Sequence, residues 1–293
     1  MAFNLAVFKT RTLTAIVFVL VMLTGLLWNH WSFFILFSII HFGCWIEYQK
    51  LVALIDPGYK NISVVHKYGV MIAGWTLMWY FTNSAFNLYE FELYSIGWWW
   101  PLIFIALLPL IDWIFAKKAQ SKNIAHSLFG LIYISLAWGL MVNLRCVDMI
   151  KKGAYFYLDF FAFVLPCVLI FSIWINDTMA YIVGSFIGKT PFSKISPKKT
   201  WEGTLGGALL AVLAVGLIAW ASGFVEYIHY AAIALIAAIA GTAGDLFESK
   251  LKRLAGVKDS GTFMPGHGGF LDRFDSLLVA TPFVWLYVIL FME

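Results

Sequence analysis

Nine long apolar runs limit what this chain can fold into more than any other feature. A helix that crosses the hydrocarbon core of a bilayer needs about 20 mostly apolar residues. Lipid offers the backbone no hydrogen-bond partners, and the alternating pattern of a membrane barrel is absent, so each run is expected to be a helix. The sequence therefore predicts an all-α polytopic membrane protein with about nine transmembrane helices, near residues 13–28, 31–46, 68–83, 96–115, 127–145, 154–175, 204–222, 228–247 and 275–292.

The composition excludes most other classes of protein. Hydrophobic residues make up 62% of the chain and charged residues 12%, and the mean hydropathy is +0.84. Soluble domains are about 45–50% apolar and about 25% charged, so a soluble domain, a disordered chain and a nucleic-acid-binding domain are all excluded. Cys44, Cys146 and Cys167 lie far apart and form no CxxC pair. They are predicted to be small buried hydrophobic residues, with no disulfide framework and no zinc site.

The distribution of Lys and Arg predicts the orientation in the membrane. With the N-terminus inside, 17 of the 20 Lys and Arg residues fall in cytoplasmic segments, and only Arg145, Lys151 and Lys152 fall outside. Cytoplasmic loops carry such an excess of positive charge, so the N-terminus is expected to be cytoplasmic. The first apolar run follows Lys9 and Arg11 but is not followed by a small-residue cleavage site. It is therefore interpreted as an uncleaved first span.

Two polar loops on the predicted cytoplasmic face separate the chain into functional parts. Residues 1–170 are predicted to form N-terminal transmembrane helices, and residues 171–293 a C-terminal membrane region that holds both loops. In the first loop, Lys198, Lys199 and Thr200 stand just before a helix expected to start near Glu202. Helix N-termini attract anions, so a phosphate site is reasonable. A basic loop that merely obeys the positive-inside rule explains these residues equally well, and the spacing is not that of a Walker loop.

The second loop runs from Gly244 to Asp275 and is denser in charge. No set of His and Cys ligands is present, so a hard, oxygen-bound cation such as Mg²⁺ is the expected metal. Asp245 follows an apolar run rich in Gly and Ala, where an unpaired charge is costly; the alternative is an ion pair with Lys252 or Arg253. Together with the first loop, the region holds six carboxylates: Asp177, Asp245, Glu248, Asp259, Asp272 and Asp275.

His267 stands among Gly266, Gly268 and Gly269, which permit tight backbone conformations beside a polar ligand. Its side chain could bind phosphate, transfer a proton or form a hydrogen bond within the loop. The sequence alone leaves these three roles open.

The spacing of the second loop is specific. It reads Ser249-x-Leu251-Lys252-Arg253, then Lys258-Asp259-x-Gly261, then Pro265-x-His267-Gly268-Gly269-x2-Asp272-Arg273-x-Asp275. This run resembles the phosphatidate cytidylyltransferase (CDP-diacylglycerol synthase) family. Ser196-Pro197-Lys198-Lys199-Thr200-Trp201-Glu202-Gly203 is similar to a second segment of that family. The resemblance covers the C-terminal part of the chain, and Met264 stands where Leu or Ile is expected.

The resemblance implies that a cytidylyl group passes from CTP to phosphatidate, giving CDP-diacylglycerol and pyrophosphate for phospholipid biosynthesis. It implies Mg²⁺ bound by Asp245 and Asp272 and a homodimer. The composition argues against a nucleic-acid partner, and the compact length favours a multi-pass protein of the bacterial cytoplasmic membrane. The residues expected to act at the reacting phosphates are Asp245, Asp272, Lys198, Lys199, Lys252, Arg253, Lys258, Asp259, His267, Arg273 and Asp275. Those expected to bind substrate are Asp177, Ser196, Thr200, Glu202, Gly268 and Gly269.

Two other functions compete with this interpretation. A multi-span anion transporter would use the basic loops to select anions at the entrance of its pathway. Transporters, however, usually place charged residues near the bilayer midplane in broken helices. Here the charged residues lie at one predicted face, and no inverted repeat is evident. A different lipid phosphotransferase is the second alternative. The Asp-Gly-x2-Ala-Arg pattern of the CDP-alcohol phosphotransferases is not found in this chain.

Overall fold

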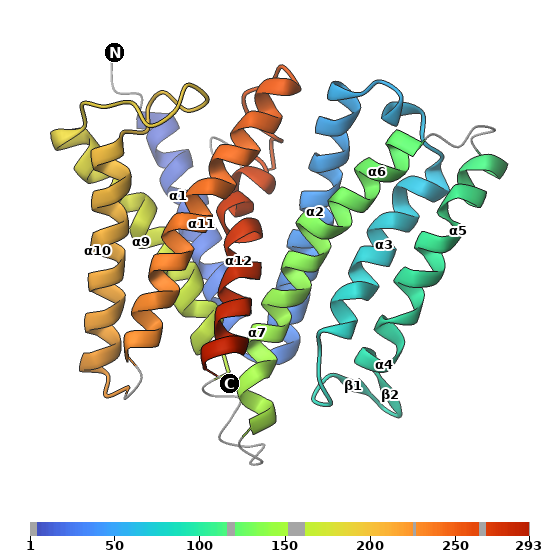
Figure 1. Ribbon diagram of the computed structural model, residues 1–293, viewed down its shortest axis with the longest axis horizontal. Helices are drawn as coiled ribbons and strands as arrows, with labels where there is room; N and C mark the ends of the chain where they lie inside the picture. The colour runs from blue at the N-terminus through green and yellow to red at the C-terminus, as the bar shows by residue number, and fades with distance from the viewer. Residues whose placement is uncertain (1–4, 116–120, 152–161, 225–226, 264–267, 293) are drawn as a thin grey trace. The chain divides into compact units, whose positions relative to one another are not determined.

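The structure is a computed structural model that describes residues 5–115, 121–151, 162–224, 227–263 and 268–292. Most of this part of the chain is helical (Figure 1). The sheet found among the described residues is a two-stranded antiparallel hairpin. In chain order the elements are α1 (Leu5–Leu27), α2 (His30–Ile55), η1 (Tyr59–Asn61), α3 (Val64–Tyr80), β1 (Asn87–Leu88), β2 (Phe91–Glu92), α4 (Leu93–Gly97), α5 (Trp99–Phe115), α6 (Ser121–Gly130), the π-helix η2 (Leu131–Leu136), α7 (Ala137–Lys151), α9 (Val164–Ile187), α10 (Trp201–Ala221), α11 (Tyr227–Leu254) and α12 (Leu271–Phe291).

The helices confirm a multi-pass membrane architecture. Each of the nine predicted ranges overlaps a helix in the described part of the chain. Among the described residues, seven segments are long and apolar enough to cross a membrane: His30–Ile55, Leu93–Phe115, Ser121–Val147, Val164–Ile187, Trp201–Ala221, Tyr227–Leu254 and Leu271–Phe291. The apolar part of α1, Thr12–Leu27, is shorter, and α3 has 17 residues. The count of nine spans and the cytoplasmic N-terminus therefore stay predictions.

The chain packs as two compact units. The first comprises residues 1–163 and 254–273, and the second comprises residues 164–253 and 274–293. Helix α12 begins in the first unit and continues in the second. The predicted functional division at residue 170 is a separate claim and stays a prediction.

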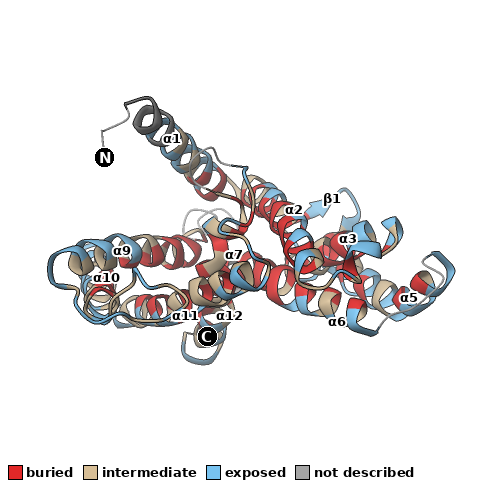
Figure 2. Ribbon diagram, turned by 90° about the horizontal axis from the view of Figure 1, so that it is seen from above, coloured by how far each residue is buried: buried red, intermediate tan, exposed pale blue. Residues whose placement is uncertain are grey.

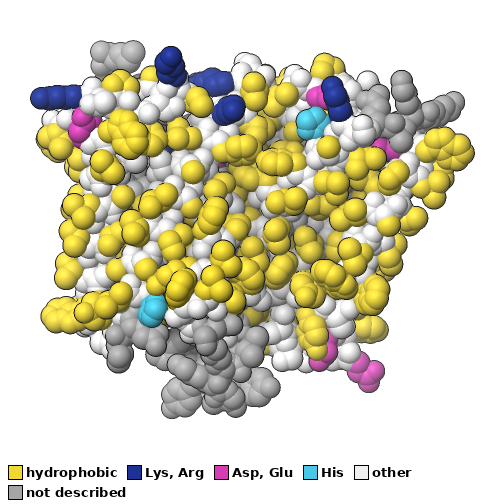
Figure 3. Space-filling view, viewed as in Figure 1, with side chains coloured by type: hydrophobic (Ala, Val, Ile, Leu, Met, Phe, Trp, Pro, Cys, Tyr) yellow, Lys and Arg dark blue, Asp and Glu magenta, His cyan; other side chains and the backbone are white. Residues whose placement is uncertain are grey.

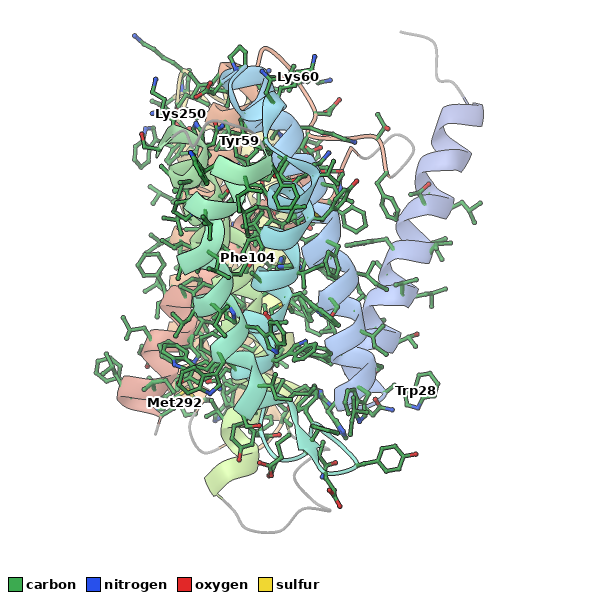
Figure 4. The ribbon with its side chains drawn as sticks, turned by 90° about the vertical axis from the view of Figure 1, so that its right-hand side faces the viewer. Trp28, Tyr59, Lys60, Phe104, Lys250 and Met292 are labelled. Carbon is green, nitrogen blue, oxygen red and sulfur yellow. The ribbon has the colours of Figure 1, made fainter. Side chains whose placement is uncertain are left out.

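Aromatic side chains form the core of the first unit. Phe37 packs between Phe33 and Trp138, with ring centroids 4.6 and 5.1 Å apart, and all three side chains are fully buried. The buried residues concentrate where α2, α3, α6 and α7 face one another, whereas α5 has a largely exposed surface (Figure 2). Trp28 and Lys60 mark the two ends of the region formed by α2 and η1 (Figure 4).

A buried polar chain ties α3, α5 and α6 of the first unit together. His66 lies 2.7 Å from the Asp112 carboxylate through Nδ1 and 2.7 Å from the Ser127 hydroxyl through Nε2. The Tyr59 hydroxyl lies 3.0 Å from the same Ser127 oxygen. These groups satisfy one another in an apolar interior, where an unpaired polar group would be costly.

Two helices extend beyond their predicted ends, and each extension corrects a prediction. Helix α2 continues from the predicted end at residue 46 to Ile55, so Glu47 lies within a span and is 5% exposed. Helix α7 continues past residue 145, so Arg145 is buried inside the unit instead of lying in an outer loop. Its guanidinium donates to the Leu26 carbonyl at 3.2 Å and lies over the Phe33 ring, and these contacts compensate the buried charge.

The second unit is built on the close packing of α9 against α10. A Cβ atom on Gly207 would come within 2.7 Å of both the Asn176 carbonyl oxygen and the Ala180 Cβ, and one on Gly203 would meet the Ala180 carbonyl oxygen. Glycine at these positions therefore lets the two backbones approach. Hydrophobic side chains cover the flanks of these helices, and Lys and Arg side chains gather at the end that carries the 188–200 loop (Figure 3). Lys250 and Met292 mark opposite ends of this unit (Figure 4).

Candidate active site

Hydrogen bonds join the two sides of the first motif loop, residues 188–200, where it leaves α9 and enters α10. Phe192 N donates to the Lys199 carbonyl at 2.8 Å, and Trp201 N donates to the Thr190 carbonyl at 2.9 Å. The carboxylate of Glu202 accepts hydrogen bonds from Lys189 N and from both the amide and the hydroxyl of Thr190. This pairing fixes the path of the loop between α9 and α10.

Helix α10 begins where the sequence predicted. Thr200 is its N-cap, and the Thr200 hydroxyl accepts a hydrogen bond from Gly203 N at 3.2 Å. Such a cap satisfies one of the free amides of the first turn. Because the cap and the Glu202 contacts fix the end of the loop, Lys198 and Lys199 stand at the start of α10.

These lysines face a cavity of about 580 Å³ in the second unit. Helix α9 contributes one wall, the motif loop and the start of α10 contribute another, and α11 contributes the third. The cavity is large enough to hold a nucleotide or a lipid headgroup, since small-molecule pockets run about 300–1,000 Å³. It is lined by Asn176, Asp177, Ala180, Tyr181, Gly184, Ser185, Ser196, Lys198, Lys199, Thr200, Thr204, Thr242 and Asp245.

The cavity combines positive charge, negative charge and an unused acceptor. The Lys199 ammonium forms an ion pair with the Asp245 carboxylate, and both side chains are about three-tenths exposed. Asp177 interacts electrostatically with both of them. The side-chain oxygen of Asn176, a residue 4% exposed, is buried and has no hydrogen-bond partner among the described residues. An orphaned acceptor beside two carboxylates favours a bound cation or donor at this wall.

The end of α11 and the start of α12 place more charge near this wall of the second unit. Gly244 lies against the backbone of Asp275, so the two helices approach closely there. The Asp275 carboxylate interacts electrostatically with those of Asp245 and Asp177. Further along α11, Lys252 forms an ion pair with the buried Glu248 one turn earlier, and Arg253 is exposed at the helix end. Asp245 is therefore in an ion pair, as the alternative interpretation predicted, but its partner is Lys199 and not Lys252 or Arg253.

The rest of the second motif loop belongs to the first unit. Asp272 lies in the first turn of α12, and its Oδ2 accepts hydrogen bonds from Ser260 N at 2.9 Å and Gly269 N at 2.8 Å. Gly268 has a φ of +86°, a left-handed conformation that favours glycine. Three charged side chains of this loop are exposed: Lys258, Asp259 and Arg273. His267 lies outside the described residues.

The structure therefore brings together six of the predicted site residues in one cavity: Asp177, Ser196, Lys198, Lys199, Thr200 and Asp245. Glu202 is not among the residues that line it, and instead closes the motif loop. Sequence reasoning did not single out Asn176, Thr242 or Glu47. A polar residue next to Asp177 in a long apolar helix was the available signal for Asn176. Glu47 was hidden because the predicted span ended one residue before it.

The cavity wall suits a hard cation. Mg²⁺ prefers oxygen ligands and usually takes one or two protein carboxylates, with water and substrate phosphates completing its shell. Asp245, Asp177 and the orphaned Asn176 oxygen offer that kind of donor set. No group of three or more His, Cys, Asp or Glu side chains with metal-binding geometry occurs among the described residues. A site here would therefore need oxygens from its substrates.

Comparison with known proteins decides the family. Residues 9–291 of the chain match the Cytidylyltransferase family. The chain belongs to this family. The match extends through both units and includes both motif loops, so the cavity lies within the region that defines this family. As a family member the chain is a nucleotidyltransferase.

Curated relatives agree with this assignment. The chain is 30% identical over 293 residues to the phosphatidate cytidylyltransferase of Haemophilus influenzae, covering 94% of this chain and 96% of the relative. It is 31% identical over 236 residues to that of Bacillus subtilis, covering 79% and 82%. It is 36% identical over 195 residues to that of Synechocystis, covering 60% of this chain and 66% of the relative.

Proposed function

We propose that this chain transfers the cytidylyl group of CTP to phosphatidate, giving CDP-diacylglycerol and pyrophosphate, at the cytoplasmic face of the cell membrane. The observation that carries the proposal is the cavity at the polar end of α9, α10 and α11, with Lys198 and Lys199 on one wall and Asp245 on another. The family match and the names of the curated relatives supply the reaction.

The reaction must bring two anions together. A phosphate oxygen of phosphatidate attacks the α-phosphorus of CTP, the bond between the α-phosphorus and its bridging oxygen breaks, and pyrophosphate leaves. Two unit charges about 4 Å apart repel by about 4 kcal/mol at an effective dielectric of 20. Catalysis therefore depends on placing positive charge between the phosphates and on holding the reactants in line.

The two lysines of the first loop supply fixed positive charge. Lys198 is exposed over the cavity, and Lys199 is held in it by Asp245. When the triphosphate binds, Lys199 exchanges one anionic partner for another, so its charge moves to the substrate without leaving the cavity. Thr200, Ser196 and Thr204 add hydroxyl groups that donate to phosphate oxygens.

Asp245 is the residue we assign to Mg²⁺, with Asp177 and the Asn176 oxygen beside it. When bound, Mg²⁺ would neutralise phosphate oxygens and fix their geometry. Asp275 on α12 adds a third carboxylate that interacts with Asp245 and Asp177, which is a further reason to expect a cation at this wall. Lys252 and Arg253 add positive charge at the end of α11. Asp272 remains our second proposed ligand, and Lys258, Asp259, His267 and Arg273 remain proposed phosphate-site residues in the second loop. The phosphate of the lipid already carries negative charge, so no strong general base is required.

The acyl chains of phosphatidate would stay in the bilayer while its headgroup enters the cavity. Tyr181, Phe186 and Ile187 on α9 are exposed apolar residues near the motif loop and suit contact with lipid. An open, lipid-bordered cavity of this kind lets a membrane substrate meet a soluble nucleotide.

The direct test uses detergent-purified protein with phosphatidate, CTP and Mg²⁺. We expect equal amounts of pyrophosphate and CDP-lipid, little product with ATP or GTP, and none with a chelator. Uptake of an anion into proteoliposomes without release of pyrophosphate would support the transporter alternative and contradict the proposal.

A further inference from the structure

Glu47 is a buried carboxylate in the apolar helix α2 that contacts the second motif loop. Its Oε2 lies 2.7 Å from the Ser260 hydroxyl oxygen and accepts a hydrogen bond from Leu271 N at 2.9 Å. Ser260 lies within the segment of the second motif loop that joins α11 to α12, residues 255–270, and Leu271 is the first residue of α12. A single side chain, more than 200 residues earlier in the sequence, therefore joins Ser260 of this loop to the first residue of α12.

The loop backbone is shaped around this carboxylate. A Cβ atom on Gly261 would overlap Glu47 Oε1, and one on Gly269 would overlap both of its carboxylate oxygens. Glycine at these two positions lets the main chain approach Glu47 from both sides. The contacts also explain how a carboxylate is tolerated within a span, because each donor it meets lowers the cost of removing it from water.

The same contacts hold Asp272. The Ser260 hydroxyl oxygen lies 2.9 Å from Asp272 Oδ2 as well as 2.7 Å from Glu47 Oε2. The amides of Ser260 and Gly269 also donate to Asp272 Oδ2. Asp272 is thus oriented by Ser260 and Gly269, and these two residues are in turn placed by Glu47.

We propose that Glu47 is a positioning residue for nucleotidyl transfer, which joins Ser260 of the second motif loop to the start of α12 and thereby fixes the Asp272 carboxylate. This inference rests on the proposed function. Glu47 is enclosed by the loop and acts on the reaction through Ser260 and Gly269. A catalytic group that is misplaced by about 1 Å can lose about 100-fold in rate, so the loss of Glu47 is expected to lower kcat and leave KM nearly unchanged.

The test compares Glu47→Ala, Glu47→Gln and Asp112→Asn. Glu47→Ala removes both contacts and should lower kcat about 100-fold. Glu47→Gln keeps an oxygen that can accept from Leu271 N and should retain more activity than Glu47→Ala. Asp112→Asn is the matched control, because Asp112 is also a buried carboxylate of the first unit but contacts His66 instead of the loop; it should keep wild-type kcat.

Amide hydrogen exchange provides a readout that does not depend on activity. In Glu47→Ala, exchange should rise in peptides covering residues 258–263 and 268–273, while the remaining peptides keep their wild-type protection. In Asp112→Asn the loop should keep its protection. Mn²⁺ binding followed by electron paramagnetic resonance, with CTP present and phosphatidate absent, should weaken in Glu47→Ala and stay at the wild-type level in Asp112→Asn; equal binding in all three proteins would contradict the proposal.

Three further results would overturn the proposal: wild-type kcat in Glu47→Ala, unchanged exchange in the loop, or an equal loss of kcat in Asp112→Asn. Should Glu47→Ala not fold, Ser260→Ala replaces it, since it removes the hydroxyl that links Glu47 to Asp272; wild-type kcat in that variant would also overturn the proposal. If the wild-type protein forms no CDP-lipid, the proposed function fails, whereas the exchange experiment still reports separately whether Glu47 orders the loop.

Discussion

Lys199 and Asp245 neutralise each other across the candidate active site. The pair is partly exposed, so its contribution to folding stability is small and its importance lies in the charge that it keeps inside the cavity. This ion pair can break when a phosphate group binds Lys199 or a metal ion binds Asp245. This explains how a cavity in a membrane protein can hold both basic and acidic groups before its substrates bind.

Lys199→Met should raise the KM for CTP with a smaller effect on the KM for phosphatidate. Hydrogen bonds to charged groups contribute about 2 kcal/mol, which corresponds to about 30-fold in binding. Steady-state kinetics with each substrate varied in turn measures the effect. Lys194→Met is the matched control, because Lys194 is an exposed lysine of the same loop that is not among the residues lining the cavity. Equal effects in both variants would mean that the loop acts by its net charge alone.

Asp245→Asn and Asp272→Asn should each abolish turnover while leaving the protein folded. Each change removes a negative charge that Mg²⁺ needs and keeps the shape of the side chain. The measurement is CDP-lipid formation over a range of Mg²⁺ concentrations, with thermal unfolding to check the fold. Asp56→Asn removes a carboxylate outside the proposed site, near the end of α2, and should keep wild-type turnover. Full activity in either of the first two variants would remove that residue from the metal assignment.

Much of the site could be predicted at the residue scale from motif spacing. Ser196, Lys198, Lys199 and Thr200 fall in the cavity because they sit just before a helix, which is a property of local sequence. Asn176 and Glu47 were missed for different reasons. Asn176 became notable only when its oxygen proved to have no partner among the described residues, and Glu47 reaches the loop through tertiary packing that local sequence does not report.

At the scale of elements, the close approach of α9 and α10 is what forms the cavity. Two glycines of α10 lie against the backbone of α9, and the motif loop that joins the helices is closed by Glu202. The positions of both helices could be predicted from hydropathy. The short distance between α9 and α10 could not be predicted, because a run of small apolar residues is compatible with either close packing or exposure to lipid.

Gly207→Ala should destabilise the protein. The new methyl group would meet the backbone of Asn176 and Ala180, and overpacking typically costs about 1–3 kcal/mol, which exceeds the gain of up to about 1 kcal/mol in helix propensity. Thermal unfolding in detergent measures the effect. Gly216→Ala in the same helix meets a single atom at 3.3 Å and should leave Tm unchanged or raise it. A lower Tm in Gly216→Ala than in Gly207→Ala would show that the α9 contact does not limit the packing.

Helix ends were the least predictable feature of the elements. Hydropathy placed the end of one span at residue 46, but α2 continues to Ile55 because Glu47, Tyr48 and Gln49 are buried by the rest of the first unit. The buried Arg145 has the same explanation, since the Leu26 carbonyl and the Phe33 ring compensate its charge. In a hydropathy plot a charged residue marks the end of a span, whereas in the folded protein the helix can continue past a charged residue that is buried and has compensating contacts.

At the scale of the whole molecule, the distribution of Lys and Arg sets the expected orientation in the membrane. The first motif loop is expected to face the cytoplasm and the β1–β2 hairpin the opposite side. The burial of Cys44, Cys146 and Cys167 makes this testable, because the native thiols should react little with an external reagent.

A cysteine placed at Tyr89 should react with a membrane-impermeant maleimide on intact cells, whereas one placed at Lys194 should react only in inverted vesicles. Both positions are exposed in the structure, so a lack of labelling reports sidedness instead of burial. Mass shifts on a gel measure the labelling, and the unsubstituted protein is the control. Labelling of the Lys194 position on intact cells would reverse the predicted orientation and place the motif loop on the wrong side for CTP.

Positional labelling of CTP tests the central claim most directly. The purified protein is given phosphatidate and Mg²⁺ with CTP labelled with ³²P at either the α- or the γ-phosphorus. Cytidylyl transfer predicts that α-label enters the lipid fraction and that γ-label is recovered only in pyrophosphate. Entry of γ-label into the lipid would show phosphoryl transfer, and no label in lipid from either nucleotide would show that this cavity does not carry out the proposed reaction.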